Sequence, residues 1–308
     1  MQGMRQFSRR MVLTSASVTL LGCTVKSAPT TGRDVSQVLP AQPTSDGAGV
    51  RLNRALGHRS LSTLDPFLLL DEFHTENPND YLAGFPEHPH RGFETVTYML
   101  HGAMEHRDVL GNQGRLGPGS AQWMTAGHGI IHSEMPKQER GLMWGFQLWV
   151  NLPKARKLIP PRYQDIAAAR IPEVEVDGAR VRIVAGSTFG AKGPVDGIDI
   201  EPLFLDVALK KGSRVVQPVS AGHTTFAFVT EGTARFGTSR REVSKGSLVI
   251  LEKGTSVELN GEGEGGRVLL LAGRPFNEPI ARAGPFVMNT EAELQQAFDD
   301  YRSGRLLL

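Results

Sequence analysis

The chain has 308 residues, 40% of them hydrophobic, so it can bury the core of one large domain or of two ordinary ones. Its 35 glycines, 19 prolines and 7% aromatic residues favour many short strands and turns, which excludes a fibre or a disordered tail. The net charge of +2 becomes −1 without Arg5, Arg9 and Arg10, which lie in a segment that we expect to be removed. This weak charge argues against nucleic acid as a partner.

The first 22 residues resemble an export signal. Arg9 and Arg10 precede a run of apolar and small residues, 11–22, that is too short to span a bilayer comfortably. Paired arginines are typical of a twin-arginine signal, and Leu20-Leu21-Gly22-Cys23 resembles a lipobox, whose cysteine is lipidated and becomes the new N-terminus. The competing interpretation is an uncleaved helix with a chance cysteine. We expect a signal peptide over residues 1–22.

Cys23 is the only cysteine, so it cannot form an internal disulfide. Its place at the end of the apolar run is the place that a lipoprotein signal requires. We therefore expect an exported lipoprotein that faces the periplasm or the cell exterior and contacts the membrane only through Cys23. Residues 23–49 are rich in Ser, Thr, Pro and Gln, which predicts a flexible tether.

From residue 50 onward, short β-prone runs alternate with turn residues, as in Phe67–Leu70, Thr95–Leu100 and Phe146–Val150. The stretch 153–171 contains Pro160-Pro161 and then at most a brief helical turn, which predicts a crossing between two domains. A second series of strands follows, and its turn glycines repeat the spacing of the first half. The pattern predicts an all-β protein with two tandem jelly-roll barrels, over residues 50–165 and 166–308.

The C-terminus differs from the rest of the chain. Thr290 and Glu293 form the pattern of a capping box, and apolar residues follow at helical spacing up to Tyr301. One short amphipathic helix is therefore predicted to close the second domain.

Two pairs of residues carry the chemistry of a metal site. His88 and His90 are two apart, and so are His132 and Glu134, so each pair projects to one face of an extended strand. On facing strands they supply three imidazole nitrogens and one carboxylate. This mixed set suits Fe(II), Mn(II), Ni(II), Cu(II) or Zn(II) and leaves positions for water or substrate.

Glu94 is the alternative fourth ligand. Residues 88, 90, 92 and 94 share one parity if the strand is continuous, although Gly92 can break it. The segment from Gly84 to Gly102 approximates the cupin pattern in which this glutamate binds the metal. The residues alone leave Glu94 and Glu134 both open.

Longer motifs then resemble the pirin family over essentially the whole span from Arg51 to Leu308. They are His88–Tyr98, Gln122–Gly127, Ile131–Pro136, Gln147–Pro153 and Gly284–Thr290. The resemblance implies a bicupin in which only the N-terminal barrel binds one divalent metal ion, usually iron. It also implies that His88, His90, His132 and Glu134 are the ligands and that Glu94 supports a ligand imidazole or Arg91.

The resemblance further implies an oxidoreductase similar to quercetin 2,3-dioxygenase, which cleaves a flavonol or a related aromatic enediol with molecular oxygen. Glu134 is the expected catalytic base. The alternative is a non-enzymatic redox sensor or adaptor of the cell envelope. Other histidines, including His106, His128 and His223, are expected to be structural, and the protein is expected to be a monomer.

Overall fold

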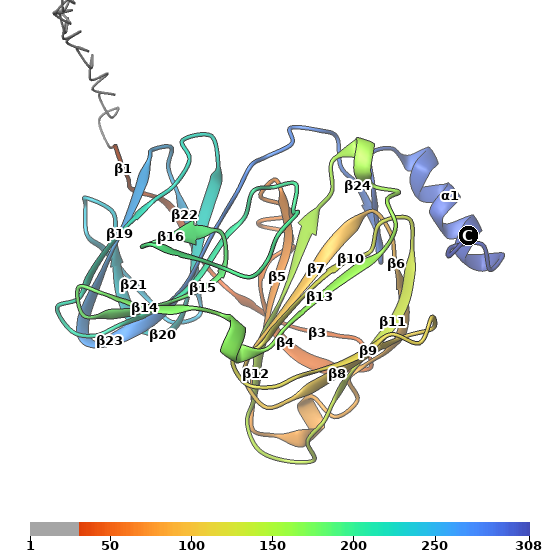
Figure 1. Cartoon of the computed structure of the whole chain (residues 1–308), viewed down its shortest axis with the longest axis horizontal. Coiled ribbons are helices and arrows are strands. Elements are labelled where there is room, and N and C mark those ends of the chain that lie inside the picture. The colour runs from red at the N-terminus through yellow and green to blue at the C-terminus, as the bar shows by residue number, and fades with distance from the viewer. Residues whose placement is uncertain (1–30) are drawn as a thin grey trace, which may run out of the picture.

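The computed structural model describes residues 31–308, which form two β-barrels side by side and one α-helix (Figure 1). The prediction of an all-β chain with two tandem barrels and a terminal helix is confirmed. The proposed signal peptide and Cys23 lie outside the described residues. Within residues 31–308, no helix combines the length and the apolar character needed to cross a bilayer.

The first barrel contains a seven-stranded and a four-stranded sheet. The larger sheet has the order β13 (Arg162–Ile166), β10 (Ala121–Thr125), β7 (Phe93–His101), β12 (Met143–Asn151), β5 (Phe67–Thr75), β4 (Val50–Leu56), β3 (Gln42–Asp46). The smaller sheet has the order β6 (Phe85–His90), β11 (Ile130–Pro136), β8 (Met104–Asp108), β9 (Gln113–Leu116). The short turns η1 (Pro78–Asp80), η2 (Lys154–Arg156) and η3 (Ala168–Arg170) lie between strands.

The second barrel is built on one ten-stranded sheet. Its main path is β14 (Glu173–Val176), β15 (Ala179–Ala185), β18 (Leu203–Leu209), β23 (Ser256–Gly273), β20 (Thr224–Phe236), β22 (Ser247–Leu251), β2 (Val35–Pro40). β1 (Gly32–Arg33) and β19 (Arg214–Pro218) pair with β23, and β21 (Arg241–Ser244) pairs with β20. Two hairpins complete the chain, β16 (Ser187–Thr188) with β17 (Ala191–Lys192) and β24 (Ala281–Ala283) with β25 (Phe286–Met288).

The alternation of side chains along the strands explains how the barrels join. On β7, Val96 and Tyr98 face a core that the two barrels share, and Thr97 faces the interior of the first barrel. The shared core includes the edge-to-face pair Phe67 and Phe226, one from each barrel, with ring centroids 4.9 Å apart. Two apolar sheet faces therefore bury each other.

The prediction of a flexible tether is wrong for its described part. β2 pairs with β22 of the second barrel, and β3 pairs with β4 of the first. Arg33 is buried and donates to the backbone carbonyls of Ser220, His223 and Glu252. A strand at the edge of a sheet gains backbone hydrogen bonds that do not depend on its side chains. The polar composition of this segment therefore did not exclude strands.

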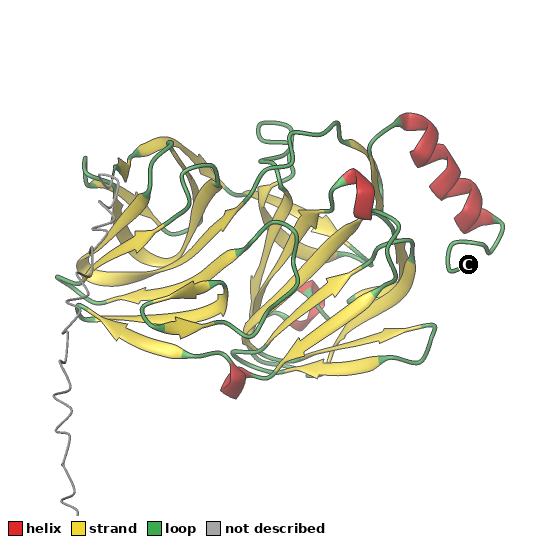
Figure 2. Cartoon of the chain, turned by 45° about the horizontal axis from the view of Figure 1, so that its top comes forward, coloured by secondary structure: helices red, strands yellow, loops and turns green. Residues whose placement is uncertain are grey.

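Two details of the crossing and of the C-terminus also differ from the prediction. The residues after Pro160-Pro161 form strand β13 before the turn η3, so this stretch belongs to the first barrel. Helix α1 (Glu291–Arg302) begins with the predicted capping box of Thr290 and Glu293. It packs on the first barrel, far from the second (Figure 2), where Arg91 contacts Asp300 at 2.7 Å.

Candidate metal centre

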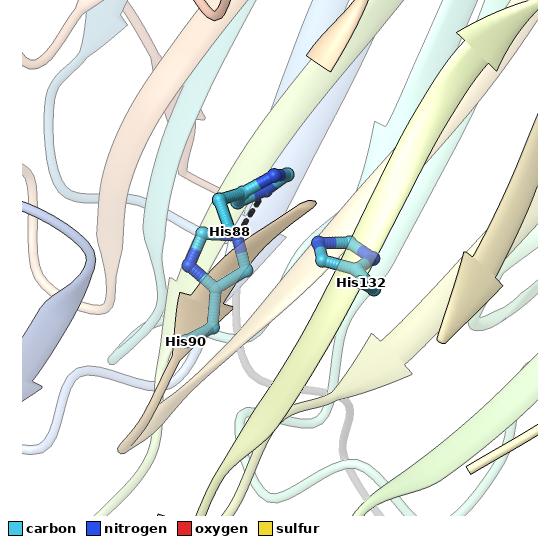
Figure 3. Close-up of side chains that lie close together, drawn as sticks. All are labelled: His88, His90 and His132. Carbon is cyan, nitrogen blue, oxygen red and sulfur yellow. Dashed lines mark hydrogen bonds between the residues drawn. The ribbon is translucent and has the colours of Figure 1, made fainter. Parts of the chain in front are cut away.

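Three histidines meet where β6 and β11 run antiparallel. His132 lies directly opposite His88 in the register, and His90 follows two residues after His88 on the same face. The rings project toward one another from the two strands (Figure 3). Their centroids lie 4.7 Å (His88 to His90), 4.5 Å (His88 to His132) and 5.1 Å (His90 to His132) apart. One nitrogen from each ring lies within 4.8 Å of the others.

The hydrogen bonds of His88 and His90 identify the nitrogens that face each other. Nδ1 of His88 lies 2.7 Å from the carbonyl oxygen of Pro86, and Nδ1 of His90 lies 3.3 Å from that of Pro285. A carbonyl only accepts, so both Nδ1 atoms carry the hydrogen and both Nε2 atoms carry a lone pair. The two Nε2 atoms lie 3.0 Å apart (Figure 3), and two lone pairs that face each other at this distance repel. A cation between them would turn this repulsion into two ligand bonds.

His132 supplies the second test of a metal. Its ring is fully buried, and neither of its nitrogens has a hydrogen-bond partner among the described residues. Buried polar atoms are normally satisfied, so an orphaned imidazole beside two others indicates a ligand. Burial, and then the neighbouring histidines, hold the pKa of His132 well below its usual value. The pKa of His90 is lowered in the same way, which keeps both rings in the neutral form that binds metal.

Glu134 lies beside this cluster but is held by other groups. Thr97 donates to its Oε1 at 2.9 Å, and Gln147 donates to its Oε2 at 2.7 Å. The carboxylate does not belong to the group of ligand atoms within 4.8 Å of one another. Each oxygen keeps a further lone pair, so Glu134 can still bind an ion or take a proton. Its role as fourth ligand stays a prediction.

A cavity of about 1130 Å³ opens onto the cluster. His88, His90, Glu134, Gln147 and Trp149 line it, together with residues of the loops near β4 and of the C-terminal segment. Three smaller hollows, of about 400 to 600 Å³, lack these histidines. The arrangement could therefore present one divalent metal to a ligand of drug-like size.

Comparisons with known proteins agree with this arrangement. The family description "Pirin" matches residues 49–150, and "Pirin C-terminal cupin domain" matches residues 204–307. The chain belongs to the pirin family. A Pseudomonas aeruginosa protein that carries a provisional quercetin 2,3-dioxygenase name is 49% identical over 89% of this chain and 98% of its own length. A pirin-like protein of Caulobacter vibrioides is 48% identical over 89% of this chain and 99% of its own.

A solved structure resembles this pirin along most of its length. It is a crystal structure of quercetin 2,3-dioxygenase from Acinetobacter baumannii, 35% identical, with a TM-score of 0.82. The superposition covers 90% of this chain and 99% of the other. The bicupin prediction is thus confirmed, and a dioxygenase-like site in the first barrel is supported.

The structure corrects the prediction for Glu94. β6 ends at His90 and β7 begins at Phe93, with Gly92 between them at φ +86°. This break shifts the parity, so Glu94 lies on the face of β7 opposite Thr97, where it accepts from Thr125 at 2.7 Å. It contacts neither a site histidine nor Arg91, which binds Asp300 and two backbone carbonyls.

Glu94→Gln is expected to stabilise this pirin at alkaline pH. Burial raises the pKa of Glu94 to about 7 from 4.5, so the folded state holds a proton that the unfolded state has lost between these values. The free energy of unfolding of the wild type should fall as the pH rises through this window. Gln cannot lose a proton, so Glu94→Gln should be more stable than the wild type at pH 8, by on the order of 2–3 kcal/mol. Urea unfolding at pH 5 and pH 8 measures it, with the exposed Glu139→Gln as the control. Equal pH slopes for wild type and Glu94→Gln would contradict the buried, protonated carboxyl.

His106 lies inside the barrel close to the candidate site, a position that the sequence analysis did not predict. It is buried in the same barrel, opposite Glu134 on β8, with Nε2 3.3 Å from Oδ2 of Asp165. The ring of Tyr163 stacks on it at 5.0 Å, and Gln122 donates to the same aspartate. Alternation along a strand at 104–108 would have placed its even positions inside the barrel, but the sequence analysis did not predict that strand.

The aromatic residues of the first barrel and the other histidines differ in their distance from the site. Trp149 and Phe93 pack beside His90, with ring centroids 5.3 Å and 5.0 Å from it. Trp123 belongs to the core shared by the barrels, away from the cavity. His128 is not among the residues that line the cavity. In the second barrel, His223 lies 3.9 Å from Glu201.

Proposed function

We propose that this pirin is a metal-dependent dioxygenase of the quercetinase type, which cleaves a flavonol or a related aromatic enediol with molecular oxygen. The observation that carries the proposal is the convergence of three imidazoles, of which His88 and His90 line a cavity of about 1130 Å³. That volume suits a fused aromatic ligand. The similar quercetin 2,3-dioxygenase of Acinetobacter baumannii supports the same activity.

His88, His90, His132 and Glu134 would hold the metal, which we propose to be iron. When bound, the ion supplies Lewis-acid chemistry that lowers the pKa of a substrate hydroxyl. Nitrogen and oxygen ligands suit Fe(II), and Mn, Ni, Cu and Zn suit them as well. Elemental analysis of protein isolated from its own host tests the assignment: stoichiometric iron supports it, and copper or zinc alone would overturn it.

Glu134 would take the substrate's hydroxyl proton. Thr97 and Gln147 each donate to one of its oxygens, which fixes the plane of the carboxylate at the cavity wall. Gln147 also lines the cavity, so its side chain connects the base to the substrate. Trp149 beside His90 supplies an apolar wall that keeps water from the reacting group.

Activity should follow metal occupancy and require oxygen. Metal-replete protein is expected to consume one O₂ for each flavonol lost, and protein stripped by a chelator is expected to consume none, because the imidazoles alone have no redox chemistry. An oxygen electrode with parallel absorbance of the flavonol measures both. Metal-replete protein that consumes no oxygen with flavonols or catechols would favour the non-enzymatic sensor.

We also propose that the protein is exported and anchored through Cys23. A protein that crosses the membrane in the folded state can acquire iron inside the cell, where copper and zinc compete less. Cys23→Ser is expected to release it into the soluble envelope fraction, and Arg9→Lys with Arg10→Lys is expected to retain it in the cytoplasm. Cell fractionation and mass spectrometry of the N-terminus measure this. Wild-type protein that is soluble in the cytoplasm and retains Met1 would contradict the proposal and leave the metal site untouched.

A further inference from the structure

The C-terminal segment brings an arginine into the cavity of the first barrel. After the second barrel ends, the chain returns and forms the hairpin of β24 and β25, whose turn residue Pro285 accepts a hydrogen bond from Nδ1 of His90. Arg282 on β24 lines the cavity together with His88, His90 and Trp149. The second domain in sequence thus contributes a cationic residue to the site of the first.

Two contacts hold the guanidinium of Arg282 in place. Its Cζ lies 4.6 Å from the centroid of the Trp149 ring, and Nη1 donates to the carbonyl of Leu68 at 2.9 Å. The Trp149 ring in turn lies 5.3 Å from that of His90. A stacked and hydrogen-bonded guanidinium is pre-organised, so it loses little entropy when it binds a ligand.

Arg282 forms no salt bridge with another of the described residues, although the charges of Asp71 and Asp46 partly offset the effect of burial on its pKa. No carboxylate oxygen in residues 31–308 lies within 4.0 Å of its nitrogens, and only one of its five N–H donors has a partner. The neighbouring Arg54 differs, because it binds both oxygens of Asp71 at 2.8 and 2.7 Å and also Asp46. A partly buried guanidinium is costly without a partner, and burial lowers the pKa of Arg282.

We propose that Arg282 binds an anionic oxygen substituent of the substrate, a carboxylate or a phenolate, while the substrate's adjacent hydroxyls face the histidines. The proposal rests on the proposed function for the position of the substrate. A guanidinium with several vacant donors matches such a group in charge and in geometry. Arg282 would then select acidic aromatic substrates over neutral ones of the same shape.

Anaerobic binding to the metal-replete protein tests the proposal without turnover. The carboxylate probe is 3,4-dihydroxybenzoate, compared with neutral 3,4-dihydroxybenzamide. The phenolate probe is a 7-hydroxyflavonol, compared with its 7-methoxy analogue above the pKa of the 7-hydroxyl. Wild type is expected to prefer the anion of one pair by about tenfold or more in Kd, as a charge-assisted hydrogen bond supplies.

Arg282→Gln is expected to abolish the preference, since Gln keeps a polar donor but carries no charge, and Arg282→Lys is expected to retain part of it. Arg51→Met, which removes an exposed charge outside the cavity, is the control and should leave the preference unchanged. Metal content and thermal melting of each variant exclude loss of the site. An anion preference that survives in Arg282→Gln, or its absence from wild type for both pairs, would overturn the proposal.

The outcomes also separate this proposal from the proposed function. An anion preference that depends on Arg282, without oxygen consumption, would refute the dioxygenase activity alone. Full dioxygenase activity without any such preference would refute the role of Arg282 alone.

Discussion

His132→Ala is expected to abolish stoichiometric metal binding while both barrels stay folded. His132 contributes the third nitrogen of the cluster, and its ring has no other partner among the described residues. Two imidazoles bind a divalent ion far more weakly than three, so the protein should lose its metal during dialysis. The fold should persist because the barrels are held by apolar burial, including the core that they share.

Elemental analysis after dialysis measures the metal, and circular dichroism with thermal melting measures the fold. His88→Ala is expected to behave in the same way, since its Nε2 faces that of His90 at 3.0 Å. His223→Ala in the second barrel is the matched control and should keep its metal. Either site variant that retained one equivalent of metal would refute the ligand assignment.

Glu134→Gln is expected to lower kcat by about 100-fold or more, because loss of a positioned general base costs 10²–10⁴. It should also weaken metal binding more than Glu94→Gln does. The two carboxyl groups differ in position. Glu134 lines the cavity, whereas Glu94 lies on the face of β7 that points away from the cavity and accepts from Thr125. Gln has the size of Glu, so packing is preserved.

Metal titration by calorimetry, followed by kcat at saturating metal, separates the loss of a ligand from the loss of a base. Glu94→Gln serves as the matched control, since it makes the same substitution at another buried position of the same barrel. If Glu94→Gln lost metal more readily than Glu134→Gln, the ordinary cupin arrangement with Glu94 as a ligand would hold instead.

Local patterns in the sequence determined the elements and the metal-binding pairs. The β-prone runs became strands, and Thr290 and Glu293 form the capping box that begins α1. The spacing of His88 and His90 predicted a shared face, because alternation along a strand is a local property of the backbone. His132 was correctly expected to converge on them, and the register of β6 with β11 shows how, whereas Glu134 of the same pair is held by Thr97 and Gln147.

Only the tertiary structure decided on which face of a strand, or in which barrel, a residue lies. The turn at Gly92 reverses the parity of Glu94, and a local pattern cannot show whether a glycine bends the chain or continues the strand. The polar segment before residue 47 forms β2 and β3 because neighbouring strands offer it hydrogen bonds, which composition does not record. Arg282 reaches the cavity of the first barrel from β24, which follows the second barrel in the sequence. Such contacts depend on how whole sheets pack, and packing is a property of the assembled chain rather than of any segment.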